Sequence, residues 1–111
     1  MFSVFFIFIV LAHGLIHFIG FAQAYGYTHF REITTTIPKQ LGQVWLATGV
    51  LFIAAILFYL FKLDAWFTIS IVSVIISQAL FVTVWKDAKF GTITNIIILI
   101  AAIIGYANSR I

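Results

Sequence analysis

Long apolar stretches dominate the chain, and the charged residues lie between them. Four stretches without Asp, Glu, Lys or Arg cover residues 1–24, 41–61, 65–85 and 91–107. Each is close to the length of about 20 residues that a helix needs to cross a bilayer. Because lipid offers no partner for backbone hydrogen bonds, these stretches are expected to be helical. The pattern predicts an all-α fold: one transmembrane domain over residues 1–111, an antiparallel up-down-up-down bundle of four transmembrane helices.

Composition agrees with this fold and excludes several protein classes. Apolar residues make up 64% of the chain and charged residues 8%, whereas a soluble domain has about 25% charged residues. The chain has no cysteine, which excludes disulfide frameworks and thiolate metal sites. A net charge of +3, placed in short loops, does not indicate nucleic-acid binding. The expected partners are the lipid bilayer and either further copies of the chain or other membrane subunits.

The loops predict the orientation of the bundle. The longest is residues 25–40, and the connections around residues 62–64 and 86–90 are short. Loops 25–40 and 86–90 together carry four Lys or Arg residues, and the opposite side carries two. Basic residues favour the cytoplasmic side. Loops 25–40 and 86–90 are therefore expected in the cytoplasm, with both termini outside.

Polar side chains from all four stretches fall in the half of the bilayer next to these two loops. At 1.5 Å per residue, His17 lies roughly 10 Å from that surface and His13 roughly 16 Å. The two histidines are four positions apart and share one helix face with Gly20. The expected lining of a polar pocket is His13, His17, Gln43, Gln78 and Asn95.

The same residues are open to other interpretations. They could simply fasten the helices to one another by hydrogen bonds. Alternatively, His13 and His17 could bind haem or a divalent metal, although no Cys, Asp or Glu within a span completes a ligand set. A small oligomeric transporter or proton pathway, with His17 titrating, is a further possibility.

A second group of residues lies at the turn before the last stretch. Trp85 and Lys89 suit a membrane interface, and Thr92 suits the start of a helix. Asp87 is not needed for anchoring, so its carboxylate is expected to be partly buried at the mouth of the pocket. Two further sets have helix-packing spacing and are expected in the core: Ser70, Ser73 and Ser77, and Gly42, Trp45 and Gly49.

Two strings carry a resemblance to a known family. They are His13-Gly14-Leu15-Ile16-His17 with Gly20-Phe21, and the run from Trp85 to Thr92 with Asn95. They resemble an uncharacterised family of small bacterial four-helix membrane proteins, similar in plan to DoxX-like proteins. The resemblance implies a four-helix fold in the bacterial inner membrane and no established activity. The plan also looks like that of small multidrug resistance transporters, but the glutamate on which those depend is missing from residues 1–24.

The sequence favours a non-enzymatic role. The loops are short, and no nucleophile–base pair, phosphate loop or carboxylate pair is visible. The leading hypothesis is a small polytopic membrane protein without a cofactor, which binds a lipid-like or small apolar ligand or serves as a subunit of a larger assembly. The alternative is a membrane redox protein that uses haem or a metal.

Overall fold

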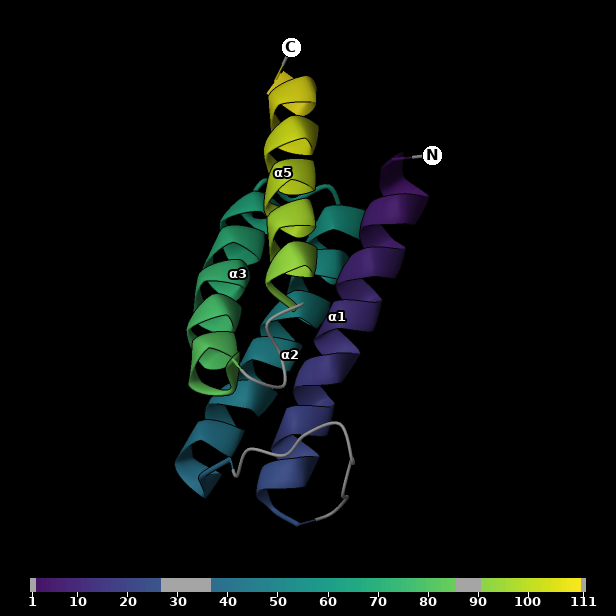
Figure 1. The fold of residues 1–111 in the computed structure, drawn as a ribbon. Helices are drawn as coiled ribbons and strands as arrows, with labels where there is room; N and C mark the ends of the chain where they lie inside the picture. Colours follow the sequence, from purple (N-terminus) through teal and green to yellow (C-terminus); the bar gives the residue numbers. More distant parts are fainter. Residues whose placement is uncertain (1, 27–36, 86–90, 111) are drawn as a thin grey trace.

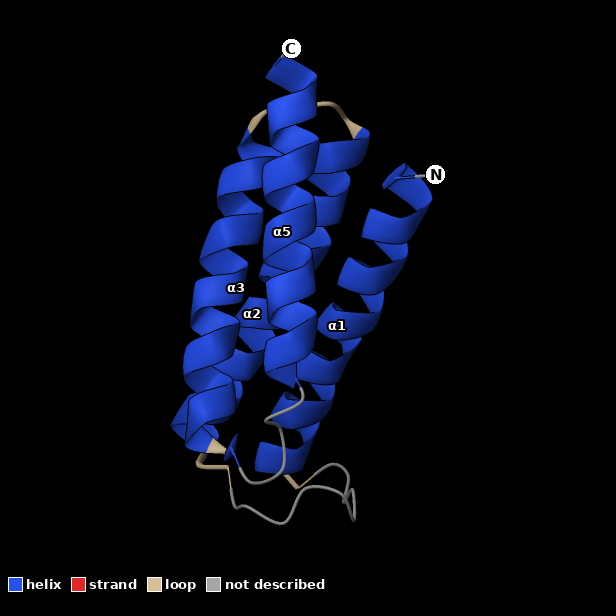
Figure 2. Cartoon of the chain, turned by 45° about the horizontal axis from the view of Figure 1, so that its top comes forward, coloured by secondary structure: helices blue, strands red, loops and turns tan. Residues whose placement is uncertain are grey.

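The computed structural model describes residues 2–26, 37–85 and 91–110, and almost all of them are helical. Four long helices follow one another along the chain (Figure 1). They are α1 (Phe2–Ala24), α2 (Lys39–Leu60), α3 (Ala65–Thr83) and α5 (Gly91–Arg110). Figure 2 shows no strand in the described part of the chain. The described residues contain helices and no strand, so the predicted all-α class is confirmed. All four helices are long and apolar enough to cross a membrane.

The helix ends differ slightly from the predicted ones, for local reasons. Helix α2 already begins at Lys39, because Pro38 has an extended backbone and its carbonyl accepts a hydrogen bond from the Gly42 N–H. Helix α3 ends at Thr83 rather than at residue 85, because the backbone of Val84 leaves the helical region. The last helix continues past residue 107 to Arg110.

The helices form a ring in which chain neighbours pack antiparallel. Contacts join α1 to α2, α2 to α3 and α3 to α5, and a looser contact between α5 and α1 closes the ring. Helices α1 and α3 therefore stand on a diagonal. Both views show α1 diverging from α5 towards the N-terminus (Figures 1 and 2). We call the end with both termini and the α2–α3 turn the terminal end, and the opposite end the loop end.

Two apolar clusters fill the bundle, and further apolar side chains cover its outside. One cluster includes Phe6, Phe52 and Trp66, and the other, at the loop end, includes Trp45 and Phe81. Large apolar side chains on all four helices are exposed, as expected where lipid replaces water. The 45 × 22 × 20 Å bundle is thus apolar over much of its outside, and its interior combines the two apolar clusters with a smaller set of buried polar side chains.

The turn from α2 to α3 is a tight helix-ending motif. The N–H of Leu63 donates to the carbonyl of Phe58, and the N–H of Lys62 donates to that of Tyr59. These two bonds define a Schellman ending, in which the residue after the cap takes a left-handed backbone. That residue is Lys62, with φ of 59°.

Candidate functional site

A chain of buried hydrogen bonds links three helices at the level of His13. The Nε2 atom of His13 lies 2.8 Å from Oδ1 of Asn95 on α5. The Asn95 Nδ2 in turn donates to Oε1 of Gln78 on α3, at 3.2 Å. His13 is 1% exposed and Asn95 2% exposed, so these bonds satisfy groups that neither water nor lipid reaches.

His17 makes a second set of bonds one turn further along α1. Its Nδ1 lies 2.8 Å from the backbone carbonyl of His13, and its Nε2 lies 2.8 Å from Oγ of Ser77 on α3. A carbonyl only accepts, so Nδ1 of His17 carries the hydrogen. In the neutral ring Nε2 is then an acceptor, and Ser77 donates its hydroxyl hydrogen to it.

The same reasoning gives His13 the opposite tautomer. Asn95 uses its NH₂ group to donate to Gln78, so its Oδ1 accepts from His13 and Nε2 of His13 carries the hydrogen. The Nδ1 of His13 is left as a lone pair, buried and without a hydrogen-bond partner among the described residues. The two histidines of α1 thus differ in tautomer because their partners differ.

Aromatic rings enclose both histidines. The ring of His17 lies 5.3 Å from that of Trp45, 5.2 Å from Phe52 and 5.4 Å from Phe81, centroid to centroid. His13 meets the rings of Phe52 and Phe81 edge-on. We call the set His13, His17, Ser77, Gln78 and Asn95 the histidine network.

The structure brings together four of the five predicted pocket residues. Gln43 is the exception: it is exposed, and no hydrogen bond among the described residues joins it to the network. Ser77 is the member that sequence reasoning placed only in the packing core. The feature of the sequence that could have placed Ser77 in the network is its position next to Gln78. Ser70 and Ser73 instead bond to carbonyls of their own helix, at Trp66 and Ile69.

A recess of about 360 Å³ approaches the network from the lipid-facing side. It lies between α1 and α5, and its lining includes Phe8, His13, Ile16 and Thr94. The walls are otherwise apolar, and Ile16 is 48% exposed. The recess therefore opens between two helices in the membrane region.

The residues predicted at the interface turn are only partly described. Trp85 is 47% exposed, as a membrane-interface tryptophan would be. The Thr92 hydroxyl is buried and lacks a partner among the described residues. Asp87 and Lys89 lie outside the described residues.

The histidines are poorly disposed for a zinc-type metal site. Both ring nitrogens of His17 and the Nε2 of His13 already hold hydrogen bonds, and a metal ion would have to displace them. Within the described part of the chain, no three His, Cys, Asp or Glu side chains gather into a ligand set. The donor set of the network does not fit a zinc centre, which needs three or four protein ligands.

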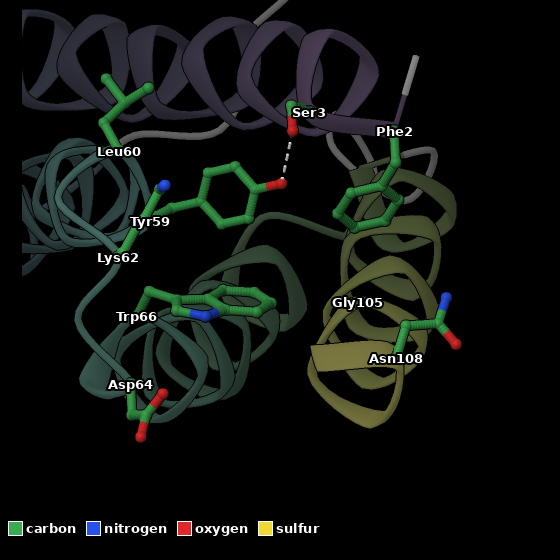
Figure 3. Close-up of a pocket in the computed structure, with 9 residues that line it drawn as sticks. All are labelled: Phe2, Ser3, Tyr59, Leu60, Lys62, Asp64, Trp66, Gly105 and Asn108. Carbon is green, nitrogen blue, oxygen red and sulfur yellow. Dashed lines mark hydrogen bonds between the residues drawn. The ribbon is translucent and has the colours of Figure 1, made fainter. Parts of the chain in front are cut away.

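A second feature, which sequence reasoning did not find, lies at the terminal end. A cavity of about 620 Å³ opens between the ends of all four helices (Figure 3). We call it the terminal cavity. Six of its lining residues give it its character: Phe2, Ser3, Tyr59, Lys62, Asp64 and Trp66.

Aromatic rings form the walls of the terminal cavity. The rings of Tyr59 and Trp66 meet edge-on with centroids 5.1 Å apart, and Phe2 lies 6.3 Å from Tyr59. The Tyr59 hydroxyl lies 2.7 Å from Oγ of Ser3 and so links α2 to α1 (Figure 3). Gly105 lets the Phe2 ring pack directly against α5, since a Cβ there would stand 2.7 Å from Cζ of Phe2.

Comparison with protein-family models, curated proteins and solved structures found no match. The resemblance carried by residues 13–21 and 85–95 therefore stays a prediction.

Proposed function

We propose that this small polytopic membrane protein is non-enzymatic and binds a lipid-like or small apolar ligand in the terminal cavity. The observation that carries the proposal is the cavity itself: about 620 Å³ of space that opens at the end of a bundle of four apolar helices. Ligand pockets generally measure about 300–1,000 Å³ and combine apolar walls with a few polar groups. The terminal cavity has this size and this mixture.

The position of the cavity favours an amphiphilic ligand. It lies where α2 ends, α3 begins and both α1 and α5 reach their terminal ends. If the apolar helices span the bilayer, this level is where acyl chains meet headgroups. An acyl chain would contact the rings of Phe2, Tyr59 and Trp66, and a polar head would lie among Ser3 and Lys62.

The histidine network supports this division of the molecule into two halves. Its hydrogen bonds hold α1 to α3 and α5 in the loop half. In the terminal half α1 diverges from α5. We propose that the network fixes one half of the bundle and lets the other half keep space for a ligand.

The location also remains a proposal. We infer that the protein lies in a bacterial cytoplasmic membrane, with loops 25–40 and 86–90 on the cytoplasmic side and both termini outside. The positive-inside distribution of Lys and Arg supports this orientation. The terminal cavity would then open on the outer side.

Quenching of Trp66 fluorescence tests ligand binding. The chain has three tryptophans, so Trp45→Phe with Trp85→Phe leaves Trp66 as the single fluorophore. Trp66 is only 5% exposed, so bulk detergent should reach it poorly. We expect an amphiphile with a brominated acyl chain to quench Trp66 in a saturable manner.

A matched pair of variants tests whether the quencher lies in the cavity. Ser3→Phe would fill the mouth, whereas Val4→Phe adds the same ring at a neighbouring position that is 68% exposed to lipid. Ser3→Phe should reduce the saturable quenching severalfold and Val4→Phe should leave it unchanged. Quenching that rises linearly, or that responds equally to both variants, would contradict the proposal.

A further inference from the structure

Lys62 occupies a backbone position that normally belongs to glycine. Its φ of 59° lies in the left-handed region, where a side chain with a Cβ is strained. The Schellman bonds from Leu63 to Phe58 and from Lys62 to Tyr59 hold it there. Glycine or asparagine would end the helix at lower cost. Backbone strain of this kind gathers at functional sites, which directs attention to what the lysine side chain does.

The strained turn places a cation at the mouth of the terminal cavity. Lys62 is exposed and lines the cavity. Figure 3 shows Lys62 drawn on the Leu60 and Tyr59 side of the cavity and Asp64 drawn on the side of Trp66, and both residues belong to the lining. The turn therefore brings the ammonium-bearing side chain of Lys62 to the lining of the cavity, two residues before Asp64, which lines it as well.

The hydroxyl pair of Ser3 and Tyr59 adds a hydrogen-bond donor to the lining of the cavity. The two oxygens are 2.7 Å apart, and one hydroxyl donates to the other. Each carries one hydrogen, so one O–H of the pair remains free to donate to a ligand, whichever way the shared bond runs. Together with the ammonium of Lys62, this donor suits an oxygen-rich, negatively charged group.

We propose that the terminal cavity selects an amphiphile with an acidic head and an acyl chain. The acidic head meets Lys62 and the free hydroxyl, and the chain lies between Phe2, Tyr59 and Trp66. This inference rests on the proposed function and specifies the ligand class. Two kinds of ligand combine an acidic head with an acyl chain. One is a free fatty acid, with a carboxylate, and the other is an anionic phospholipid of the bilayer, with a phosphate.

Head charge can be varied while the chain is kept constant. In the Trp66-only protein, in phosphatidylcholine nanodiscs, a brominated fatty acid is titrated against its methyl ester at a pH where the carboxylate is ionised. One lysine near an anionic group changes binding by about fivefold. We expect the ester to bind about fivefold more weakly than the acid. The Lys62→Gln variant should bind the acid only as weakly as the wild-type protein binds the ester.

Three further variants separate the charge of Lys62 from its structural role. Lys62→Arg keeps the charge on the same backbone and should restore binding of the acid. Lys39→Gln removes a cation at the loop end, where it lies 5.9 Å from the ring of Tyr25, and should change nothing. Asp64→Asn should leave binding of the acid equal or tighter, since it removes an anion from the lining that repels an acidic head.

Competition then distinguishes the two sources. Replacing part of the phosphatidylcholine with phosphatidylglycerol should abolish quenching by the fatty acid if the anionic phospholipid is the occupant. Quenching that persists in phosphatidylglycerol nanodiscs identifies the free acid as the ligand.

The failures of the two proposals can be told apart. Saturable quenching that is equal for acid and ester and indifferent to Lys62→Gln would overturn the acidic-head inference and leave ligand binding intact. Asp64→Asn weakening the acid as much as Lys62→Gln would also overturn it, because loss of an anion cannot weaken an acid electrostatically and both effects would then reflect the structure of the turn. No saturable quenching by either compound would overturn the proposed function itself.

Discussion

His17 on α1 and Ser77 on α3 form a 2.8 Å hydrogen bond across the diagonal of the bundle. Helices α1 and α3 are not neighbours in the ring, so this bond joins elements that otherwise meet mainly through α2 and α5. The imidazole of His17 is fully buried, and its other nitrogen is held by the carbonyl of His13. The bond therefore fixes the spacing of the diagonal as well as the rotation of both helices.

Loss of the Ser77 hydroxyl should destabilise the bundle. Ser77→Ala leaves Nε2 of His17 without a donor, and interhelical bonds in membrane proteins contribute about 0.6 kcal/mol on average, with a maximum near 1.7 kcal/mol. We expect Ser77→Ala to lower the free energy of unfolding in detergent by about 1 kcal/mol, measured by denaturant titration.

A double-mutant cycle with His17→Leu identifies the bond itself. In that background Ser77→Ala should cost much less, because its partner is gone. Ser73→Ala is the matched control, since the Ser73 hydroxyl bonds to Ile69 of its own helix. Additive effects of the His17 and Ser77 changes would refute a direct bond.

The two histidines should show opposite tautomers. Solid-state ¹⁵N spectra of labelled protein in lipid are expected to place the hydrogen of His17 on Nδ1 and that of His13 on Nε2, as their partners require. Asn95→Leu removes the acceptor of His13 and should change only the His13 signals. Identical tautomers in the wild-type protein would contradict the assigned network.

A methyl group at Gly20 should disturb the contact between α1 and α2. A Cβ at this position would lie 2.4 Å from Cε3 of Trp45, closer than atoms can approach. Overpacking of this kind costs about 1–3 kcal/mol, so Gly20→Ala should lower stability in detergent by that amount. The loss should shrink in the Trp45→Leu background, and a loss of equal size in both backgrounds would show that the indole is not the cause.

Orientation in the membrane can be tested by cysteine labelling, since the chain has no cysteine of its own. Ser3→Cys and Asn108→Cys are at exposed positions of the terminal end, and Gln40→Cys is at the loop end. With the predicted topology, an impermeant maleimide added to intact cells should label the first two and spare Gln40→Cys until the cells are opened. The reverse pattern would invert the predicted orientation.

The four helices could be predicted because hydropathy alone defines them. A charge-free apolar run must hide its backbone in a helix when it lies in lipid, whatever its neighbours do. The helix ends could not be predicted to the residue, because they depend on local geometry. One example is the bond from the Thr83 hydroxyl to the Leu80 carbonyl, next to Val84, where the backbone leaves the helix.

Depth along each helix predicted most of the histidine network but not the partner of His17. The rise per residue places Ser77 and Gln78 at nearly the same height, yet their side chains point about 100° apart. The rotation of α3 decides which one meets α1, and rotation follows from packing in three dimensions. The exposure of Gln43 has the same cause. Its depth along α2 matches the network, but the rotation of α2 directs its side chain away from the bundle interior.

The pattern of apolar residues does not predict the terminal cavity. It depends on the divergence of α1 from α5 and on the left-handed backbone of Lys62. Neither property is encoded in hydropathy, which describes each helix separately. Phe2, Tyr59 and Trp66 come from three different helices, and nothing in the spacing of the chain relates them.

The bond between His13 and Asn95 also constrains the order of assembly. Its two residues are separated by 82 positions, and a ribosome adding about 5–20 residues per second needs roughly 4–16 s to make that length of chain. During this time α1 carries an imidazole whose partner has not yet been made. Helix α5 is therefore the element that satisfies the imidazole of α1, and a nascent chain in which α5 has not yet been made would expose an unsatisfied polar group within the membrane.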